Sequence, residues 1–455
     1  MKTYFICILV VLSCTACSRK QAENSYQPHE YVELKHPEWS KSATIYEVNV
    51  RQYTPEGTFK AFEAHLPRLK KMGVDIIWLM PIHPIGVEKR KGTLGSYYSV
   101  KDYYGINPEF GTKADFKHLV DQIHQMGMHV IIDWVANHSS WDNPLAKDHP
   151  EWYTKTEEGQ FQPTPWYDWD DVIDFDYDQP GIREYMTKAL VYWVKDFDID
   201  GYRCDTAGFI PTDFWNQARA EMDAVKPVFM LAEWESRDLH QKAFDMTYSW
   251  TLFDKMAAVT RDHKPLGGLI EYMAHDVSTF PRDGYRMTFT DNHDMNSWNH
   301  NMLYNFGDGL QASMVLCGTI NGMPLVYGGQ EAGLDRSLKF FDKDLINWKS
   351  LPYEKIFTQI FDLKHQNKAL WNGKEGGVMV RMYNDKPEQV LSFSRKKDNN
   401  QVITLINYSA EPASVTLKSE HQKGLYKEWF SGQDMQLRGN DILTLKPWEY
   451  KVLVQ

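Results

Sequence analysis

Cysteine is scarce in this 455-residue sequence, which contains five. Three of them, Cys7, Cys14 and Cys17, lie close to the N-terminus. The other two, Cys204 and Cys317, lie in apolar runs, where we expect packed thiols and not a disulfide or a metal-binding pair. The low count therefore argues against a disulfide-stabilised scaffold and against a cysteine-based metal centre.

Positive charge is also in short supply, with 50 lysines and arginines against 61 acidic residues and a formal net charge of −11. Nucleic acids attract basic surfaces, so this balance argues against a nucleic-acid partner. The sequence has no internal repeat and no low-complexity tract. No GxGxxG motif follows the first predicted strand, which removes the main support for a dinucleotide-binding fold.

The apolar run at the N-terminus, residues 4–12, is too short to span a bilayer as a helix. It follows Lys2 and leads into small residues before Cys17, a pattern that resembles a bacterial lipoprotein signal peptide. We therefore expect a signal peptide at 1–17, a lipid on Cys17 that anchors the protein to a membrane, and a polar tether at 18–37. The expected location is the periplasm or the cell surface; ordinary secretion with cleavage nearby is the alternative.

From Ala43 onward, short apolar strands alternate with amphipathic helices, which predicts an α/β protein with a parallel sheet. The number of strands favours a closed (β/α)₈ barrel, residues 38–372, over an open doubly wound sheet. The predicted strands are 44–50, 74–80, 129–135, 201–204, 228–232, 243–248, 286–290 and 324–327. The predicted helices include 59–72, 113–126, 181–197, 212–225 and 309–321.

Two segments depart from this alternation. Residues 138–174 are rich in aromatic residues, prolines and acids without a clear helical pattern, and we expect a loop-rich insertion on the barrel face where active sites lie. After Asn372 the apolar residues recur with period two, which predicts an antiparallel β-sandwich domain at 373–455. Its predicted strands are 390–394, 402–407, 415–417 and 448–454.

Arg203 and Asp205 lie on the same side of the predicted strand 201–204, because side chains alternate along a strand. A guanidinium beside a carboxylate keeps it ionised, as a nucleophile at neutral pH requires. Alone, the pair is equally compatible with a surface ion pair. Two further strands, however, end in the acids Glu233 and Asp294, and in a barrel all these ends meet at one face.

Two carboxylates that flank one point suit retaining glycoside hydrolysis, in which one is the nucleophile and the other the acid/base. Crowding by like charges and apolar walls is expected to raise the pKa of Glu233. For any one of these acids a buried salt bridge is the alternative.

These strand-end segments resemble, in their order, the conserved regions of the alpha-amylase family of glycoside hydrolases. The segments that carry the resemblance are 133–138 (DWVANH), 201–208 (GYRCDTAG), 232–234 (AEW) and 291–294 (DNHD), joined by 73–81 (GVDIIWLMP), 172–176 (VIDFD) and 322–331 (GMPLVYGGQE). The resemblance extends from Ala43 to about Trp348, and a trailing β-domain fits it as well.

The resemblance implies a role for each matching residue. Asp205 would be the nucleophile, Glu233 the acid/base and Asp294 the stabiliser of the transition state. The implied substrate-binding residues are Tyr98, which stacks on the sugar, His138 and His293, which bind its hydroxyls, Arg203, which orients the nucleophile, and Trp234.

The chain also departs from the family's pattern. Members that bind a structural calcium use the asparagine at Asn137 and the aspartate at Asp174, together with a histidine where this chain has Phe209. Gly208 and Phe209 replace a Lys-His pair that contacts the leaving-side sugar in many amylases. No further sugar-binding pair can be placed in 334–348.

Thr206, directly after the implied nucleophile, resembles members that cut α-1,4 bonds, and no separate starch-binding module is evident. The resemblance therefore implies hydrolysis of maltodextrins and soluble starch fragments. A transglycosylase or isomerase that acts on short α-glucosides would use the same residues. A non-catalytic sugar-binding relative is the alternative from another class, but such relatives lose one or more of the acids.

Overall fold

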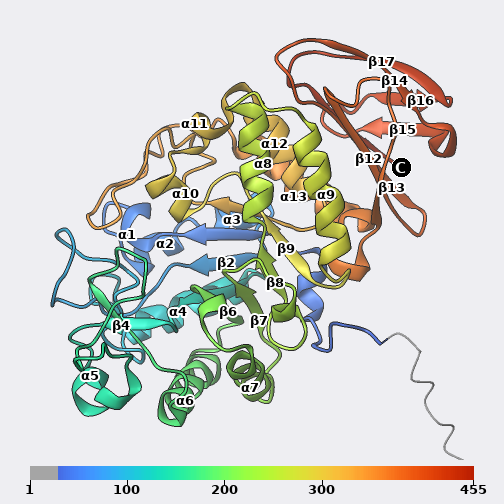
Figure 1. The fold of residues 1–455 in the computed structure, drawn as a ribbon. Coiled ribbons are helices and arrows are strands. Elements are labelled where there is room, and N and C mark those ends of the chain that lie inside the picture. The colour runs from blue at the N-terminus through green and yellow to red at the C-terminus, as the bar shows by residue number, and fades with distance from the viewer. Residues whose placement is uncertain (1–28) are drawn as a thin grey trace, which may run out of the picture. The chain divides into compact units, whose positions relative to one another are not determined.

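Eight parallel strands close into a barrel at the centre of the molecule, as predicted (Figure 1). The structure, a computed structural model, describes residues 29–455. The expected signal peptide and the lipid site at Cys17 lie outside these residues. The barrel order is β1-β10-β9-β8-β7-β6-β3-β2. Its strands are β1 (Ile45–Val48), β2 (Ile76–Leu79), β3 (His129–Trp134), β6 (Gly201–Cys204), β7 (Phe229–Ala232), β8 (Met246–Tyr248), β9 (Tyr285–Thr288) and β10 (Met323–Tyr327).

Helices surround the barrel strands (Figure 1). They include α2 (Phe59–Glu63), α3 (Leu66–Met72), α4 (Lys113–Gln125), α6 (Pro180–Phe197), α7 (Thr212–Asp223), α8 (Trp250–Thr260), α9 (Gly267–Thr279), α12 (Leu310–Thr319) and α13 (Glu354–Gln366). The predicted helix 59–72 is divided in two, because Pro67 begins a new helix where its missing N–H costs nothing. The predicted strand 44–50 ends earlier, since the short helix α1 (Val50–Tyr53) follows β1.

At the base of the insertion after β3, β4 (His138–Ser140) pairs with β5 (Val172–Asp174). No clear helix was expected here, but the structure contains α5 (Pro144–Asp148). Asn143 caps this helix by accepting a hydrogen bond from the backbone N–H of Leu145, and Pro144 occupies its first turn. The short helices α10 (His293–Trp298) and α11 (Met302–Phe306) lie after β9.

The C-terminal strands form a six-stranded antiparallel sheet and a two-stranded sheet, with one hydrophobic cluster that joins them. The larger sheet contains β11 (Val378–Arg381), β12 (Val390–Lys397), β13 (Asn400–Asn407), β18 (Tyr450–Val454), β15 (Gly424–Glu428) and β16 (Asp434–Leu437). The smaller sheet contains β14 (Ala413–Lys418) and β17 (Asn440–Leu445). This agrees with the expected antiparallel β-domain and adds β11, β15, β16 and β17 to the predicted strands.

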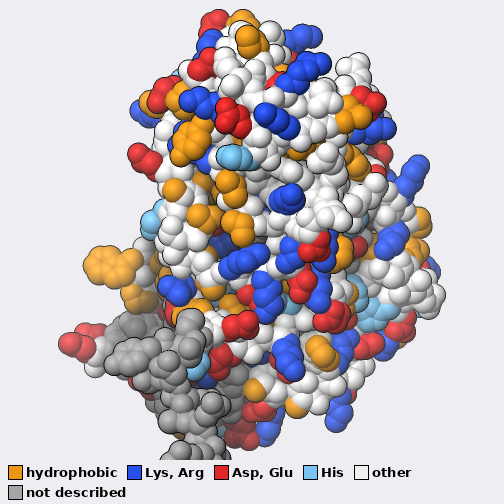
Figure 2. Space-filling view, turned by 90° about the vertical axis from the view of Figure 1, so that its right-hand side faces the viewer, with side chains coloured by type: hydrophobic (Ala, Val, Ile, Leu, Met, Phe, Trp, Pro, Cys, Tyr) orange, Lys and Arg blue, Asp and Glu red, His pale blue; other side chains and the backbone are white. Residues whose placement is uncertain are grey.

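Three features of the structure concern the predicted partners: the charge of the surface, any membrane-spanning helix and the last residues of the expected tether. On the face shown in Figure 2, acidic and basic side chains are interspersed. In the described part of the chain no helix is long and apolar enough to cross a membrane. Residues 32–37 lie against the barrel: Val32 is buried, and a ring nitrogen of His36 hydrogen-bonds to Asp245 at 2.7 Å.

Candidate active site

A cleft of about 530 Å³ opens at the carboxyl ends of the barrel strands. It contains six of the predicted site residues: Tyr98, His138, Asp205, Glu233, His293 and Asp294. Its further lining residues come from the loops after β2 and β10, from the insertion and from the end of α10, and include Lys91, Asp168, Trp169, Trp298, Phe340 and Phe341. Sequence reasoning missed this second group, because loop residues follow no period that would mark them.

The close pairing of β6 with its neighbours brings the acids together. At Gly201, with φ of +145°, an added Cβ would lie 1.9 Å from the carbonyl oxygen of Phe229, so only glycine fits where β6 meets β7. The pairing continues beyond the strand, since the backbone N–H of Glu233 donates to the carbonyl of Cys204 at 3.0 Å. Asp205 and Glu233 therefore lie just after neighbouring strands, at the same level of the barrel.

Arg203 is the centre of this arrangement and is fully buried. One terminal nitrogen of its guanidinium contacts carboxylate oxygens of Asp205 and Asp133, each at 2.8 Å. The other lies 3.0 Å from Glu233 Oε1, an ion pair and not a well-aligned hydrogen bond. Its Nε donates to the hydroxyl of Tyr248 at 3.1 Å. A single cation thus holds the carboxylates of Asp205 and Glu233 side by side.

Glu233 keeps its proton at neutral pH. Its burial, together with the charges of Asp205 and Asp294, raises its pKa to about 8, although Arg203 acts in the opposite direction. The backbone N–H of Thr206 donates to its Oε2 at 2.6 Å and fixes the orientation of the carboxyl group. An acid with this pKa can donate a proton at neutral pH.

Asp133 was not predicted to belong to the site, yet it lies beneath it. Its carboxylate accepts hydrogen bonds from Arg203, from the indole N–H of Trp78 at 3.2 Å and from the hydroxyl of Tyr98 at 3.2 Å. Burial and the nearby charge of Asp205 raise the pKa of Asp133 to about 7, against the effect of Arg203. The sequence could have revealed Asp133, because an acid inside an otherwise apolar strand needs a buried partner.

His293 links the cleft to a second acid that the sequence did not reveal, Glu47 on β1. One ring nitrogen of His293 contacts Glu47, and the other lies 2.8 Å from the hydroxyl of Tyr98 and 3.3 Å from Asp294 Oδ2. Burial lowers the pKa of His293, but Asp294 and Glu47 outweigh it and raise the pKa to about 9. The histidine is therefore a cation at neutral pH, and Tyr98 stacks on it with ring centroids 5.5 Å apart.

Asn137 and Asp174, the candidate calcium ligands, bond directly to each other, with Asn137 Nδ2 donating to Asp174 Oδ1 at 3.2 Å. The hydroxyl of Thr164 donates to the same oxygen at 2.5 Å. Calcium takes roughly six to eight oxygen ligands. Among residues 29–455 no group of three or more His, Cys, Asp or Glu residues is placed to hold a metal ion. One carboxylate with a hydroxyl and an amide does not fit calcium.

Trp234 lies outside the lining of the cleft, in a row of aromatic side chains beside it. Its indole covers Gly208, where an added Cβ would approach the ring to 2.1 Å. Its ring lies 5.2 Å from Phe209, which lies 5.7 Å from Tyr167. Tyr167 in turn stacks at 4.3 Å on Trp169, which lines the cleft. The residues that replace the expected Lys-His pair thus support an apolar border on the Glu233 side.

Comparison with known proteins assigns the fold and the site to a family. Residues 37–378 match the family described as "Alpha amylase, catalytic domain", and residues 380–452 match "Maltogenic Amylase, C-terminal domain". The structure is similar to that of a noncanonic maltogenic alpha-amylase, AmyB, from Thermotoga neapolitana, at 33% identity and a TM-score of 0.81 over 91% of this chain and 98% of that one. It is also similar to an alpha-amylase from Lactobacillus plantarum, at 29% identity and a TM-score of 0.82 over 92% and 99% of the two chains.

Among curated relatives, the alpha-amylase MalA of Haloarcula japonica is 25% identical over 84% of this chain, and the match spans 57% of MalA's own length. The family match covers most of the chain and includes every strand of the barrel. The chain therefore belongs to the alpha-amylase family of glycoside hydrolases, with a C-terminal domain of the maltogenic amylase type.

Proposed function

We propose that the protein is a retaining glycoside hydrolase that cleaves α-1,4-glucosidic bonds in maltodextrins and starch fragments. The observation that carries the proposal is the contact of one guanidinium, that of Arg203, with both Asp205 and Glu233. Retaining enzymes hold their two carboxyl groups about 5–5.5 Å apart, whereas inverting enzymes leave roughly 6.5–9.5 Å for a water molecule. Two acids that share one guanidinium fit the shorter spacing.

In this mechanism Asp205 attacks the anomeric carbon while Glu233 gives its proton to the departing glycosidic oxygen. The C–O bond breaks, the leaving sugar departs as an alcohol, and a glycosyl ester forms on Asp205. Glu233, now a carboxylate, takes a proton from water, whose oxygen attacks the same carbon and releases Asp205. Asp294 stabilises the positive charge that develops on the ring in both steps.

Aromatic walls on two sides of the cleft support a substrate of several glucose units. Trp298 and Phe340 pack at 5.2 Å on one side, and Trp169 forms the other. Sugar rings present apolar faces that stack on such side chains. Relatives named maltogenic alpha-amylase and cyclomaltodextrinase share the family and support α-glucans as the substrate class.

Transfer of the glycosyl group to a sugar instead of water is the second candidate, because the aromatic row beside Glu233 offers an apolar surface to an incoming acceptor. Products from maltoheptaose, pullulan, isomaltose and sucrose would separate the two activities. Products longer than the substrate would favour transfer, and only shorter products would favour hydrolysis.

The decisive experiment is proton NMR of the first sugar released from maltoheptaose, recorded before mutarotation. Two displacements at one carbon retain its configuration, so we expect the α-anomer. Initial release of the β-anomer would refute the nucleophilic role of Asp205.

Substitution tests the same roles independently. We expect Asp205→Asn and Glu233→Gln to reduce turnover, the latter by roughly 10²–10⁴-fold as for loss of a general acid. The exposed Asp178→Asn is the matched control and should keep full activity. Either site variant that retains more than about a tenth of the wild-type rate would contradict the two-carboxylate mechanism.

A further inference from the structure

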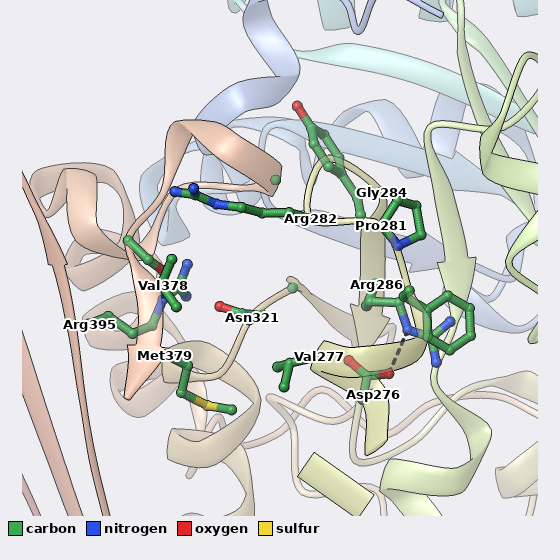
Figure 3. A pocket seen from close by; sticks show the side chains of 15 residues that line it. Asp276, Val277, Pro281, Arg282, Gly284, Arg286, Asn321, Val378, Met379 and Arg395 are labelled. Carbon is green, nitrogen blue, oxygen red and sulfur yellow. Dashed lines mark hydrogen bonds and ion pairs between the residues drawn. The ribbon is translucent and has the colours of Figure 1, made fainter. Parts of the chain in front are cut away.

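A second pocket, of about 240 Å³, lies at the amino ends of β9 and β10, the opposite end of the barrel from the cleft. It is bounded by α9, the loop before β9, the loop before β10, and β11 and β12 of the C-terminal domain (Figure 3). Three arginines line it, Arg282, Arg286 and Arg395, and we call it the arginine pocket. Nothing in the proposed mechanism uses these residues.

The single acid in the lining, Asp276, is already committed to one of the arginines. Arg286 Nε donates to Asp276 Oδ1 at 3.0 Å, and Arg286 Nη2 donates to Glu235 Oε1. Arg286 also stacks on the ring of Phe280, with the guanidinium carbon 3.6 Å from the ring centroid. This arginine is therefore neutralised from within the chain.

Arg395 has no such compensation. Its guanidinium is buried and donates only to backbone carbonyls, those of Gly377 at 3.0 Å, Ile320 at 2.8 Å, Trp371 at 3.1 Å and, more weakly, Thr319 at 3.4 Å. Burial lowers its pKa to about 9. In the described part of the chain no carboxylate pairs with it, and a buried charge without a counter-charge is unfavourable.

Arg282 is the second uncompensated cation. It is exposed at the rim and forms no ion pair with the residues that the structure describes. Figure 3 shows its side chain extending along the pocket toward β11, on the side where Arg395 and the amide of Asn321 also lie. Two guanidinium groups and an amide thus line the same cavity as the apolar side chains of Val277 and Phe280.

We propose that the arginine pocket binds a small ligand that carries an oxyanion, a phosphate or a carboxylate, on a body no larger than a monosaccharide. Guanidinium groups match the geometry of both oxyanions and bind them through paired N–H donors. The volume lies just below the about 300–1,000 Å³ usual for ligand pockets, which excludes an oligosaccharide. The ligand's anion supplies the counter-charge that Arg395 lacks, and its body packs on the apolar wall.

The proposal is tested by isothermal titration calorimetry of the protein, residues 29–455, with glucose 1-phosphate and with glucuronate. The two ligands separate a phosphate from a carboxylate. Methyl α-glucoside is the uncharged probe. We expect at least one anionic probe to bind and methyl α-glucoside to bind at least tenfold more weakly. Arg282→Gln should weaken binding of the anionic probe about tenfold, because it removes one charge-assisted contact.

Two further variants make the result specific. Arg381→Gln removes the same charge from β11, outside the pocket lining, and should bind the anionic probe like the wild type. Val277→Trp keeps every charge but fills the cavity from its exposed wall, and should abolish binding. Absence of binding by both anionic probes, equal binding to Arg282→Gln or Val277→Trp, or equally tight binding of methyl α-glucoside would overturn the proposal. Hydrolysis of maltoheptaose by Arg282→Gln should be unchanged, which keeps this outcome separate from the proposed function.

Discussion

Single residues at the strand ends set the protonation pattern of the cleft. Arg203 compensates Asp133, Asp205 and Glu233 with one positive charge. Burial, together with the charge of Asp205, raises the pKa values of Asp133 and Glu233, because one cation does not fully offset these effects. Glu233, the proposed acid, therefore keeps its proton, while the same arginine contacts Asp205, the proposed nucleophile.

The raised pKa of Glu233 predicts the alkaline side of the pH–rate profile. Its pKa of about 8 lies above the ordinary 4.5, so the acid form persists through neutral pH and is lost as the pH rises through about 8. We expect kcat/KM for maltoheptaose to fall above that pH, measured by initial rates from pH 5 to 10. Glu233→Gln cannot ionise, so its residual activity should lack this decline. A decline at the same pH in Glu233→Gln would assign it to another group.

At the scale of elements, the loop after β6 determines which side chains lie beside Glu233, the proposed acid/base. Gly208 has no side chain, and the indole of Trp234 occupies the space that a Cβ would take. Phe209 then packs against that indole and against Tyr167 of the insertion. One glycine therefore connects the β6 loop, the β7 loop and the insertion into a single aromatic border.

Gly208→Ala tests this connection. The new methyl group should displace the half-buried indole of Trp234, change tryptophan fluorescence and raise KM for maltoheptaose, with little change in stability because the ring can move outward. Gly267→Ala, at the start of α9, is the control, since a Cβ there meets nothing within 4 Å. That variant should leave KM and the tryptophan fluorescence unchanged. Unchanged fluorescence and KM in Gly208→Ala would show that Trp234 does not border the substrate.

Residues Val32 to Gln455 form one compact unit, in which the barrel and the C-terminal strands share a hydrophobic core. Strands β12, β13 and β18 turn one set of side chains toward the barrel core, including Leu391, Phe393 and Val452. The alternate residues, such as Ile403 and Leu453, belong to the separate cluster of the β-domain. Arg395 and Trp429 add hydrogen bonds from the β-domain to backbone carbonyls of Ile320 and Gln359.

We therefore expect a single cooperative transition in differential scanning calorimetry, because neither part can lose its partner without exposing apolar surface. A chain that ends at residue 379 should be poorly soluble for the same reason. Two well-separated transitions, or a soluble and active barrel alone, would contradict this expectation.

The expectation that the protein is exported concerns the whole molecule and rests on the sequence, because Cys17 lies outside the described residues. We propose that Cys17 carries a lipid, because small residues precede it and a polar segment follows it. Metabolic labelling with a fatty acid should mark the wild-type protein and not Cys17→Ser. Equal labelling of the two would exclude Cys17 as the lipid site.

Local patterns in the sequence were sufficient for the barrel and for the residues at its strand ends. All eight barrel strands were predicted, since buried parallel strands appear as short apolar runs between helices. Asp205, Glu233, His293 and Asp294 were predicted to share one face, and the structure places them in one cleft. Helix α9 was not predicted, because it begins with two glycines, which are poor helix formers.

Only the tertiary structure decided which distant side chains meet. Asp133 lies opposite Arg203 because β3 and β6 pair in that register, and Glu47 reaches His293 because the barrel closes β1 onto β10. Trp234 covers Gly208, and Arg395 and Arg282 line one pocket, although the residues of each pair are not neighbours in the sequence. Periodicity encodes which face of an element is buried, but register and closure fix its neighbours. Those neighbours set the pKa of Glu233 and create the arginine pocket.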